Sequence, residues 1–156
     1  MTTHIMSFTY APKIDAVLSG ECRQTIRKKR EGRKIKHGDF ILFHGWEGRP
    51  YRSKWSWRKK VRVTEVAPLW IHENYVRGTL LRYVWDSETM NVQWIFRLPR
   101  TAQYVWDSET MNHVAVEDGI DPPTGEALKE TLKKLNGPDW EGEYEIIRWE
   151  PVEGSE

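Results

Sequence analysis

The segment RKKVRVTEV, residues 58–66, constrains the fold of this chain more than any other feature. Charged and apolar residues alternate along it, a pattern that predicts a β-strand with one face buried and the other in water. Such a strand needs neighbours that complete its hydrogen bonds. The apolar runs FILFHGW at 40–46 and EYEIIRWEPV at 143–152 predict two of them. A β-sheet is therefore the expected framework of the fold.

Helical patterns flank these strands. Residues 11–20 predict a helix that ends at Gly20, with an apolar face formed by Ile14, Val17 and Leu18. Residues 124–136 predict a second helix, with Thr124 as its N-cap and Gly137 after its last turn. The order of strand, helix, several strands, helices and strand is typical of an α+β fold built on a strongly curved sheet or a small barrel.

The nonapeptide YVWDSETMN occurs twice, at 83–91 and at 104–112. Two copies are too few for a solenoid, so a local duplication is the plain interpretation. The first copy runs into VQWIF, which favours a strand or a loop, whereas Ser108 in the second copy can cap a helix. We therefore expect the same nine residues to adopt different structures, because flanking residues and packing override local propensity.

The length of 156 residues suits one domain, residues 1–156. Within it we expect residues 67–106 to form a tryptophan-rich insertion that carries one copy of the repeat, and residues 151–156 to form a loose tail. No apolar run approaches the ~18 residues of a membrane span, and the first residues lack the pattern of a signal peptide. The single Cys22 cannot form an internal disulfide, which favours the cytoplasm. We expect no metal site, because paired cysteines and the HExxH spacing are absent from the sequence, and no cofactor.

The net charge of +1 conceals a strong separation of charge. Residues 23–62 contain fifteen Lys or Arg and three Asp or Glu, so this block carries +12, and the rest of the chain carries −11. A basic block indicates a polyanionic partner, of which nucleic acid is the usual one. A solvated surface without a partner is the alternative interpretation.

Part of this basic block interleaves cations with aromatic rings. Single-stranded nucleic acid binds to such mixtures, because cations contact its phosphates and rings stack on its bases. The spacing puts Trp55 and Trp57 on one strand face, so burial of both in the core is the alternative. His44 is expected to be an ordinary strand residue. We predict nucleic-acid contacts from Arg23, Arg27, Lys28, Arg49, Tyr51, Arg52, Lys54, Trp55, Arg58, Lys59 and Lys60.

The turn GECRQTIR, residues 20–27, resembles the G-x-K-x-x-T-x-R signature of the ASCH domain family, a branch of the PUA-like superfamily. The matching positions are Gly20, Thr25 and Arg27. The segments IKHGDFI and HVAVEDGID resemble the strand entry and the helix end of the same family. The likeness covers most of residues 5–66 and 107–149, and leaves out the tryptophan-rich stretch.

The resemblance implies a PUA-like curved β-barrel with helices packed over it, and a cleft between barrel and helix. It also implies binding of RNA or of modified nucleosides. Some members of the family look like hydrolases of N4-acylated cytidine, and one branch is ribonuclease-like. The acidic residue of the family's site would be Glu117, with Asp118 as the alternative. This chain departs from the signature where Cys22 stands in place of the lysine.

The missing lysine leaves three possibilities open. In the first, the Arg23 side chain turns into the site, although strand alternation points it to the other face. Cys22 acts as a thiolate nucleophile beside the basic residues. In the third case the site binds its ligand without cleaving it.

We therefore expect a domain that binds RNA, or a nucleotide within it, in a basic cleft. Arg27 would hold phosphate there, while Thr25 and Glu117 would hydrogen-bond the base. A metal-independent hydrolase of RNA or of acylated cytidine is the first alternative, with Thr25 or Cys22 as nucleophile and Glu117 as acid and base. A protein-interaction domain with a basic face is the second alternative.

Overall fold

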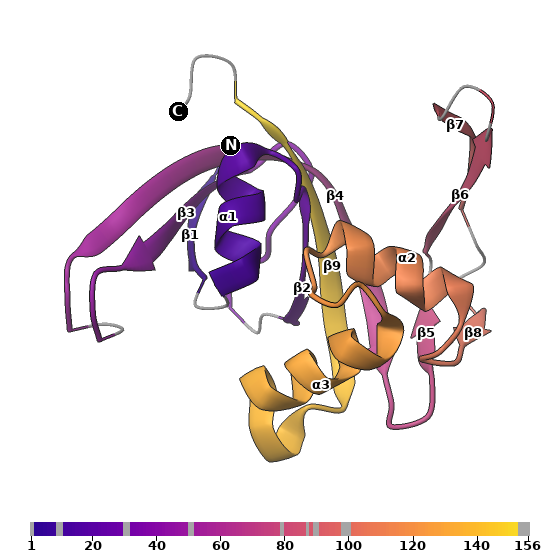
Figure 1. The fold of residues 1–156 in the computed structure, drawn as a ribbon. Helices are drawn as coiled ribbons and strands as arrows, with labels where there is room; N and C mark the ends of the chain where they lie inside the picture. The colour runs from indigo at the N-terminus through magenta and orange to yellow at the C-terminus, as the bar shows by residue number, and fades with distance from the viewer. Residues whose placement is uncertain are drawn as a thin grey trace.

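The chain folds around one curled β-sheet, as the ribbon in Figure 1 shows. The computed structural model describes residues 2–8, 11–29, 32–49, 52–78, 80–86, 88, 91–97 and 101–152. The strands are β1 (Thr3–Ser7), β2 (Gln24–Lys28), β3 (Phe40–Trp46), β4 (Trp55–Ile71), β5 (Val76–Gly78), β6 (Leu81–Asp86), β7 (Asn91–Arg97), β8 (Gln103–Tyr104) and β9 (Gly142–Pro151). The helices are α1 (Ala11–Ser19), α2 (Glu109–Glu117), α3 (Gly125–Asn136) and the short 3-10 helix η1 (Gly137–Asp139).

The 17-residue strand β4 joins the two parts of the sheet. Its N-terminal half pairs with β3, and its C-terminal half pairs with β9 and β5. β9 pairs in turn with β2, and β3 pairs with β1. The curl therefore runs in the order β2–β9–β4–β3–β1, while β5 and β8 extend the other end of β4. The predicted strands at 40–46, 58–66 and 143–152 all lie in this sheet, which confirms the expected framework.

The curl stays open between β1 and β2. These two strands do not pair with each other, and the Arg27 side chain bridges them by donating from Nη2 to the carbonyl oxygen of Ser7 at 2.7 Å. The predicted mixture of helices with a curved sheet is confirmed. The described strands do not close into a barrel, because side chains and not backbone hydrogen bonds span this gap.

Two hydrophobic cores lie on the two faces of β9. Ile147 packs in the core under α1 with Val17, and its neighbour Ile146 packs in the core under α2 and α3. Adjacent strand residues point to opposite faces, so β9 serves both cores. The predicted apolar face of α1 is wrong at one position, since Leu18 is 41% exposed. The buried stripe instead follows Lys13 and Val17, which are four residues apart on the helix.

Both predicted helix caps are present. The hydroxyl of Ser108 accepts a hydrogen bond from the amide of Met111, and the hydroxyl of Thr124 accepts one from the amide of Ala127. Gly20 follows α1 with a φ of 86°, the left-handed conformation expected of a residue that ends a helix. None of the described helices is long and apolar enough to cross a membrane.

The two copies of YVWDSETMN adopt different structures, as predicted. Glu88 lies in a turn between β6 and β7, whereas its counterpart Glu109 begins α2. Asn91 begins β7, whereas its counterpart Asn112 is helical. β6 and β7 pair with each other as a separate two-stranded ribbon, so the segment VQWIF, for which a strand or a loop was expected, lies in a strand. The second copy buries Met111 in the core under α2 and α3.

A β-bulge separates the two tryptophans that the sequence places on one face. Arg58 pairs with His44 and Trp55 pairs with Trp46, so β4 has one extra residue between these pairs. As a result Trp57 packs inward against Phe8, with ring centroids 6.4 Å apart, while Trp55 stacks on His44. The prediction that Trp55 and Trp57 share a face is wrong, because a bulge reverses the alternation.

Candidate functional site

A cleft of about 340 Å³ lies at the open seam between β1 and β2, with α1 and α3 beside it. We call it the seam cleft. Its apolar wall is formed by Phe8, Ile26, Ile120, Leu128 and Leu132. Its polar and charged lining includes Ser7, Lys13, Thr25, Arg27, Lys28, Asp118 and Asn136. An apolar cavity with a few convergent polar groups is typical of a small-molecule or cofactor site.

Thr25 is a buried polar residue of this cleft. It lies in β2, is 2% exposed and lines the cavity. Its hydroxyl makes no hydrogen bond to any residue that the structure describes. This hydroxyl is not among the buried side-chain atoms that lack a hydrogen-bond partner, and it belongs to a residue that lines the cavity, where a ligand that offers a donor or an acceptor can reach it.

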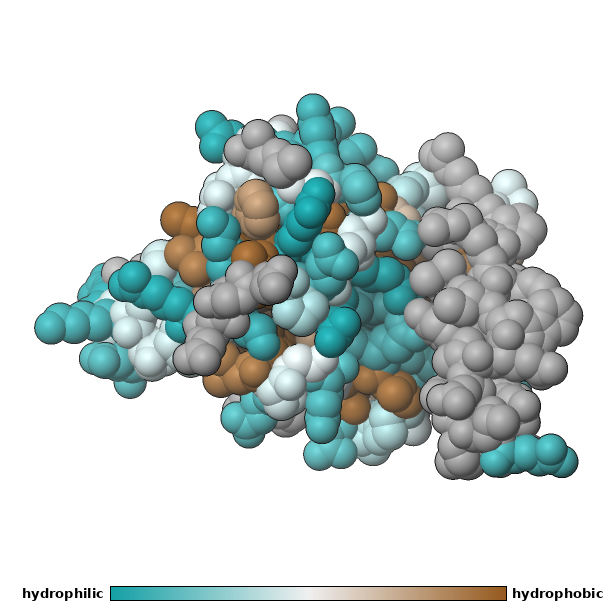
Figure 2. Space-filling view, turned by 90° about the horizontal axis from the view of Figure 1, so that it is seen from above, coloured by the Kyte–Doolittle hydropathy of each residue, from teal (hydrophilic) through white to brown (hydrophobic). Residues whose placement is uncertain are grey.

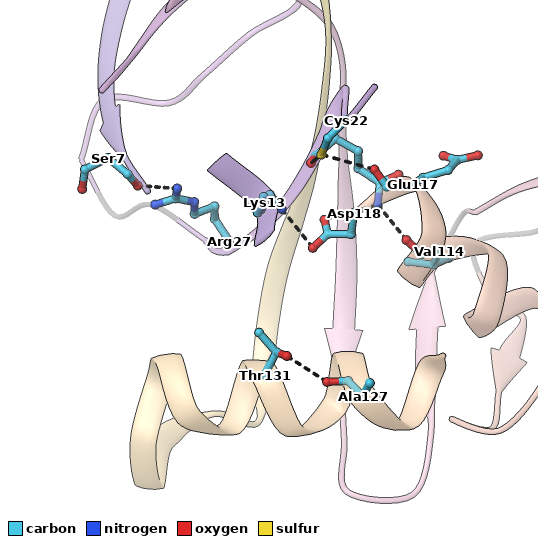
Figure 3. A network of polar contacts seen from close by, with 10 residues as sticks. Ser7, Lys13, Cys22, Arg27, Val114, Glu117, Asp118, Ala127 and Thr131 are labelled. Atoms are coloured by element: carbon cyan, nitrogen blue, oxygen red, sulfur yellow. Dashed lines mark hydrogen bonds and ion pairs between the residues drawn. The ribbon is translucent and has the colours of Figure 1, made fainter. Parts of the chain in front are cut away.

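Lys13 and Asp118 form a buried ion pair on the wall of the cleft, shown in Figure 3. The distance from Nζ to Oδ2 is 3.0 Å, and the two side chains are 7% and 5% exposed. Asp118 also accepts a hydrogen bond from Nε2 of Gln24 at 3.4 Å. Burial raises the pKa of the Asp118 carboxyl, and the Lys13 ammonium opposes that rise.

The sequence analysis did not select Lys13. The lysine precedes the motif and belongs to α1, where charged residues usually face water. One signal pointed to its burial, because Lys13 lies four residues before the buried Val17 and so shares its helix face. Nothing in the local sequence indicated that the end of α2 would bring a carboxylate to meet it.

Positive charge predominates in the cleft. The Arg27 guanidinium lies 4.9 Å from the centre of the Phe8 ring, and Nζ of Lys13 lies 5.6 Å from the same point. Lys28 also lines the cleft, and its ammonium donates to the backbone carbonyl of Asp139. Three cations therefore share the cavity with the single carboxylate of Asp118. This excess of positive charge favours an anionic ligand.

The residues of the cleft come from the end of β1, from α1, from β2 and from the segments around α2 and α3. No model of a known protein family, no curated protein and no solved structure matches this chain. The likeness to the ASCH signature therefore rests on GECRQTIR and on the two segments that accompany it.

Cys22 lies outside the cleft. It belongs to the core under α1 and is 2% exposed. Its Sγ donates to the carbonyl oxygens of Gln24 at 3.3 Å and of Glu117 at 3.5 Å. Burial raises the pKa of the Cys22 thiol, so the reactive thiolate is disfavoured. These features are typical of a structural cysteine.

Glu117 and Asp118 point in different directions at the end of α2. The Glu117 carboxylate accepts a hydrogen bond from Nη1 of Arg148 at 2.6 Å and is directed away from Lys13 (Figure 3). Asp118 is the C-cap residue of α2 and lines the seam cleft. Successive residues near a helix end differ by about 100° in direction, so one of the two can face the cleft. Asp118, which the sequence analysis named as the alternative to Glu117, is the one that faces the cleft.

The predicted nucleic-acid contacts are spread over different surfaces. Arg27 and Lys28 line the cleft, but Arg23 donates from Nε to the carbonyl of Gly20 at the end of α1. Arg58 and Lys60 are exposed, whereas Lys59 points to the other face and donates to the carbonyl of Leu18. The remaining described members are the exposed Arg49, Arg52 and Lys54 and the half-buried Trp55; Tyr51 lies outside the described residues. Figure 2 shows mostly hydrophilic residues at the projecting end of the β3–β4 hairpin.

Within the described part of the chain, no group of three His, Cys, Asp or Glu side chains is placed to hold a metal ion. The cleft itself brings together an ammonium, a guanidinium, a hydroxyl and a carboxylate. Such a set can hold an anion and read the edge of a polar ring by hydrogen bonds.

Proposed function

We propose that this domain binds single-stranded RNA and holds one nucleotide in the seam cleft. The observation that carries the proposal is the excess of cations in a cleft that Thr25 also lines, with three basic residues against the carboxylate of Asp118. The apolar wall suits the faces of a base, and Thr25 and Asp118 suit its polar edge. Arg27 and Lys28 suit a phosphate, which guanidinium groups bind with charge-assisted hydrogen bonds.

Single-stranded RNA is favoured over a duplex because a base must leave its stack to enter such a cavity. Membership of the ASCH family and a relationship to PUA-like barrels remain predictions from the motif. A cytoplasmic location remains a prediction from the single cysteine.

The variant Arg27→Gln tests the proposal against the matched control Arg23→Gln. Both changes remove one positive charge, but the second lies outside the cleft. A fluorescently labelled single-stranded RNA of mixed sequence is titrated with each protein, and the anisotropy is followed. Hydrogen bonds to charged groups contribute about 1.5–3 kcal/mol, so we expect Arg27→Gln to weaken binding by about 10- to 100-fold. The control should bind within about 3-fold of the unmodified protein.

Equal binding by both variants would exclude the cleft as the RNA site. If the unmodified protein fails to bind RNA at low salt, RNA binding itself is excluded. A hydrolase of acylated cytidine and a protein-interaction domain would then be the remaining predictions. Thermal unfolding of each variant shows whether loss of the bridge from Arg27 to Ser7 has changed the fold.

A hydrolase is the second candidate function, and the pairing of Lys13 with Asp118 favours it. The motif lacks its lysine, yet α1 brings an ammonium to the wall of the cavity that contains Thr25. In such a site Oγ of Thr25 would attack the acyl carbonyl carbon of an N4-acylated cytidine. As the bond from that carbon to N4 breaks, the hydroxyl proton would pass to the leaving N4 nitrogen, and water would then hydrolyse the acyl-threonine to the carboxylic acid and free Thr25. The ammonium of Lys13 would stabilise the negative charge that develops on the carbonyl oxygen. Asp118 would hold that ammonium in position.

The variant Thr25→Val separates the two functions, because it removes the hydroxyl and keeps the shape of the side chain. The unmodified protein is incubated with labelled RNA and, separately, with N4-acylcytidine, and products are followed by denaturing gel and by chromatography. Turnover that disappears in Thr25→Val while RNA is still bound would establish the hydrolase. Intact substrates in both reactions would exclude it. Cys22 does not enter this scheme, because it lies outside the cleft.

A further inference from the structure

The seam cleft continues into a second cavity of about 410 Å³, which we call the side chamber. The two cavities share Ser7, Arg27, Lys28 and Asn136 in their lining. The side chamber also reaches His44 of β3. A ligand anchored in the seam cleft can therefore extend past Arg27 towards the centre of the sheet.

A third hollow, of about 450 Å³, lies beyond the side chamber. It is lined by Glu47, Lys54, Trp55 and Arg58, and we call it the Trp55 shelf. His44 connects the two, because its ring stacks on Trp55 with the centroids 3.9 Å apart and the planes at 15°. The Arg58 guanidinium lies over the same ring, 4.9 Å from its centre.

Strand register places these three hollows along one line. Ser7 of β1 pairs with His44 of β3, and His44 pairs with Arg58 of β4. Neighbouring strands are about 4.8 Å apart, so this row is about 10 Å long. Stacked nucleotides advance about 3.4 Å each along a strand, so the row spans up to about three of them.

The charge and chemistry of the shelf match a nucleic-acid strand. Lys54 and Arg58 form no ion pair with any described residue, although Glu47 lines the same hollow. Regular alternation would have placed Trp55 on the same face as Trp57. The β-bulge instead turns Trp55 to the face that carries His44 and Arg58. Bulges that re-aim a side chain are frequent next to functional sites. An aromatic ring beside cations without acidic partners is the arrangement that stacks a base and holds its phosphate.

We infer that the RNA strand crosses the sheet from the seam cleft, through the side chamber, to the Trp55 shelf, where a further base stacks. The inference rests on the proposed function, since it needs a nucleotide anchored in the seam cleft. It adds to that function the direction in which the RNA strand crosses the sheet and the minimum length of the RNA. The full ligand is an oligonucleotide of at least about three nucleotides and not a free nucleoside.

The test compares ligands of different length by calorimetric titration at low salt. The ligands are the four nucleoside 5′-monophosphates and single-stranded RNA of two, four and eight nucleotides. The proteins are the unmodified chain, Trp55→Leu, Arg58→Gln and the control Arg62→Gln. Arg62 is exposed on the same strand as Arg58 but lies outside the row, since it pairs with Phe40. Thermal unfolding confirms that each variant is folded.

We expect the four-nucleotide RNA to bind about 10- to 100-fold more tightly than the best monophosphate, as stacking of one base on an aromatic ring predicts. Trp55→Leu and Arg58→Gln should remove this gain and leave binding of the monophosphate unchanged. Arg58→Gln should also lower the slope of log K against log salt by about one, whereas Trp55→Leu should not. Arg62→Gln should retain the gain.

Other outcomes overturn the inference in distinguishable ways. If a monophosphate binds but longer RNA gains nothing, or gains equally in Trp55→Leu and Arg58→Gln, the path is wrong and the proposed function stands. If Arg62→Gln loses the gain and Arg58→Gln keeps it, the strand runs along β4 and not across the sheet, which also refutes the path. If neither monophosphates nor RNA bind, both the path and the proposed function fail.

Discussion

Replacing Lys13 by methionine isolates the energetics of the buried ion pair in the cleft. The change removes the ammonium and keeps a side chain of similar length on the buried face of α1. Asp118 then keeps the Gln24 amide as its remaining side-chain partner among the described residues. Because its side chain is 5% exposed, water from the cleft can replace only part of the stabilisation that the ammonium gave.

The expected cost follows from the geometry of the pair. At 3.0 Å, and with an effective dielectric constant of about 20, two unit charges attract each other by about 5.5 kcal/mol. Desolvation of both ions offsets much of that attraction, so the intact pair contributes little net stability. Removal of one partner leaves the other charge buried alone, and we expect Lys13→Met to lower the free energy of unfolding by about 3–5 kcal/mol at pH 7. The double variant Lys13→Met with Asp118→Asn should recover most of this loss, because it buries no charge.

The decrease in the free energy of unfolding caused by Lys13→Met should also depend on pH. Burial raises the pKa of Asp118 in the folded protein, and removal of the Lys13 charge raises it further. A carboxyl with a raised pKa in the folded state favours folding when it is protonated, so its penalty is complete above that pKa. The destabilisation by the charged Asp118 carboxylate decreases as the pH falls from this raised pKa towards the ordinary pKa of an aspartate. The deficit of Lys13→Met should therefore be smaller at pH 5 than at pH 7.

Urea unfolding, followed by tryptophan fluorescence at both pH values, measures these differences. The single and double variants are compared with the unmodified chain under identical conditions. A cost below about 1 kcal/mol for Lys13→Met at pH 7 would refute the idea that the pair is buried away from water. A double variant no more stable than the single one would show that lost packing, and not the unpaired charge, causes the effect.

Three further predictions concern residues outside the cleft. A methyl group added by Gly45→Ala would lie 2.1 Å from Nε1 of Trp57, so we expect a loss of about 1–3 kcal/mol in thermal unfolding; an unchanged melting temperature would contradict the packing of Trp57. The hydrogen bond from His4, at 2.9 Å, lowers the pKa of Asp39, so its contribution to stability is present above the ordinary pKa of an aspartate and is lost as the pH falls through the lowered value. Acid unfolding should therefore show a deficit for His4→Leu that narrows below pH 4, and a deficit constant with pH would count against the contact. Cys22 should react with iodoacetamide at pH 7.5 at least about 100-fold more slowly than in the urea-unfolded chain, since its thiol is buried with a raised pKa; equal rates would show that the site is open to solvent.

Local signals in the sequence predicted much of the fold. Helix caps at Ser108 and Thr124 and the strands around FILFHGW and RKKVRVTEV follow from residue chemistry and alternation within a few positions. The length of β4 did not follow in the same way, because the alternation covers residues 58–66 and the strand continues through Pro68 to Ile71. Pro68 is tolerated because β3 pairs with β4 up to Arg62 and β5 begins to pair at Leu69. Between Arg62 and Leu69, no described strand pairs with the edge of β4 that faces away from β9. The amide hydrogen that Pro68 lacks would point to this unpaired edge, so its absence costs little.

The candidate site was predictable only where its residues belong to one short segment. Thr25 and Arg27 reach the cleft as the motif suggested, since both lie on the strand that follows the turn. The meeting of Lys13 with Asp118 depends on the packing of α1 and α2 against the same end of β2, which no local pattern specifies. The outward position of Trp55 depends on a bulge, and one extra residue in a pairing register leaves no mark in the sequence.

The duplicated nonapeptide indicates a duplication within this chain. Removal of residues 83–103 erases one repeat unit and joins Arg82 directly to Tyr104. The deletion takes Gln103 of β8 with it, so the shortened chain would link β5 to Tyr104, the remaining residue of β8, through residues 79–82, a four-residue connection well within the usual range for hairpins. The β6–β7 ribbon pairs with no strand of the seven-stranded sheet, so its removal breaks no pairing among β1, β3, β4, β9 and β2. Recombination between the two copies of the repeat could therefore delete the ribbon while these five strands stay paired.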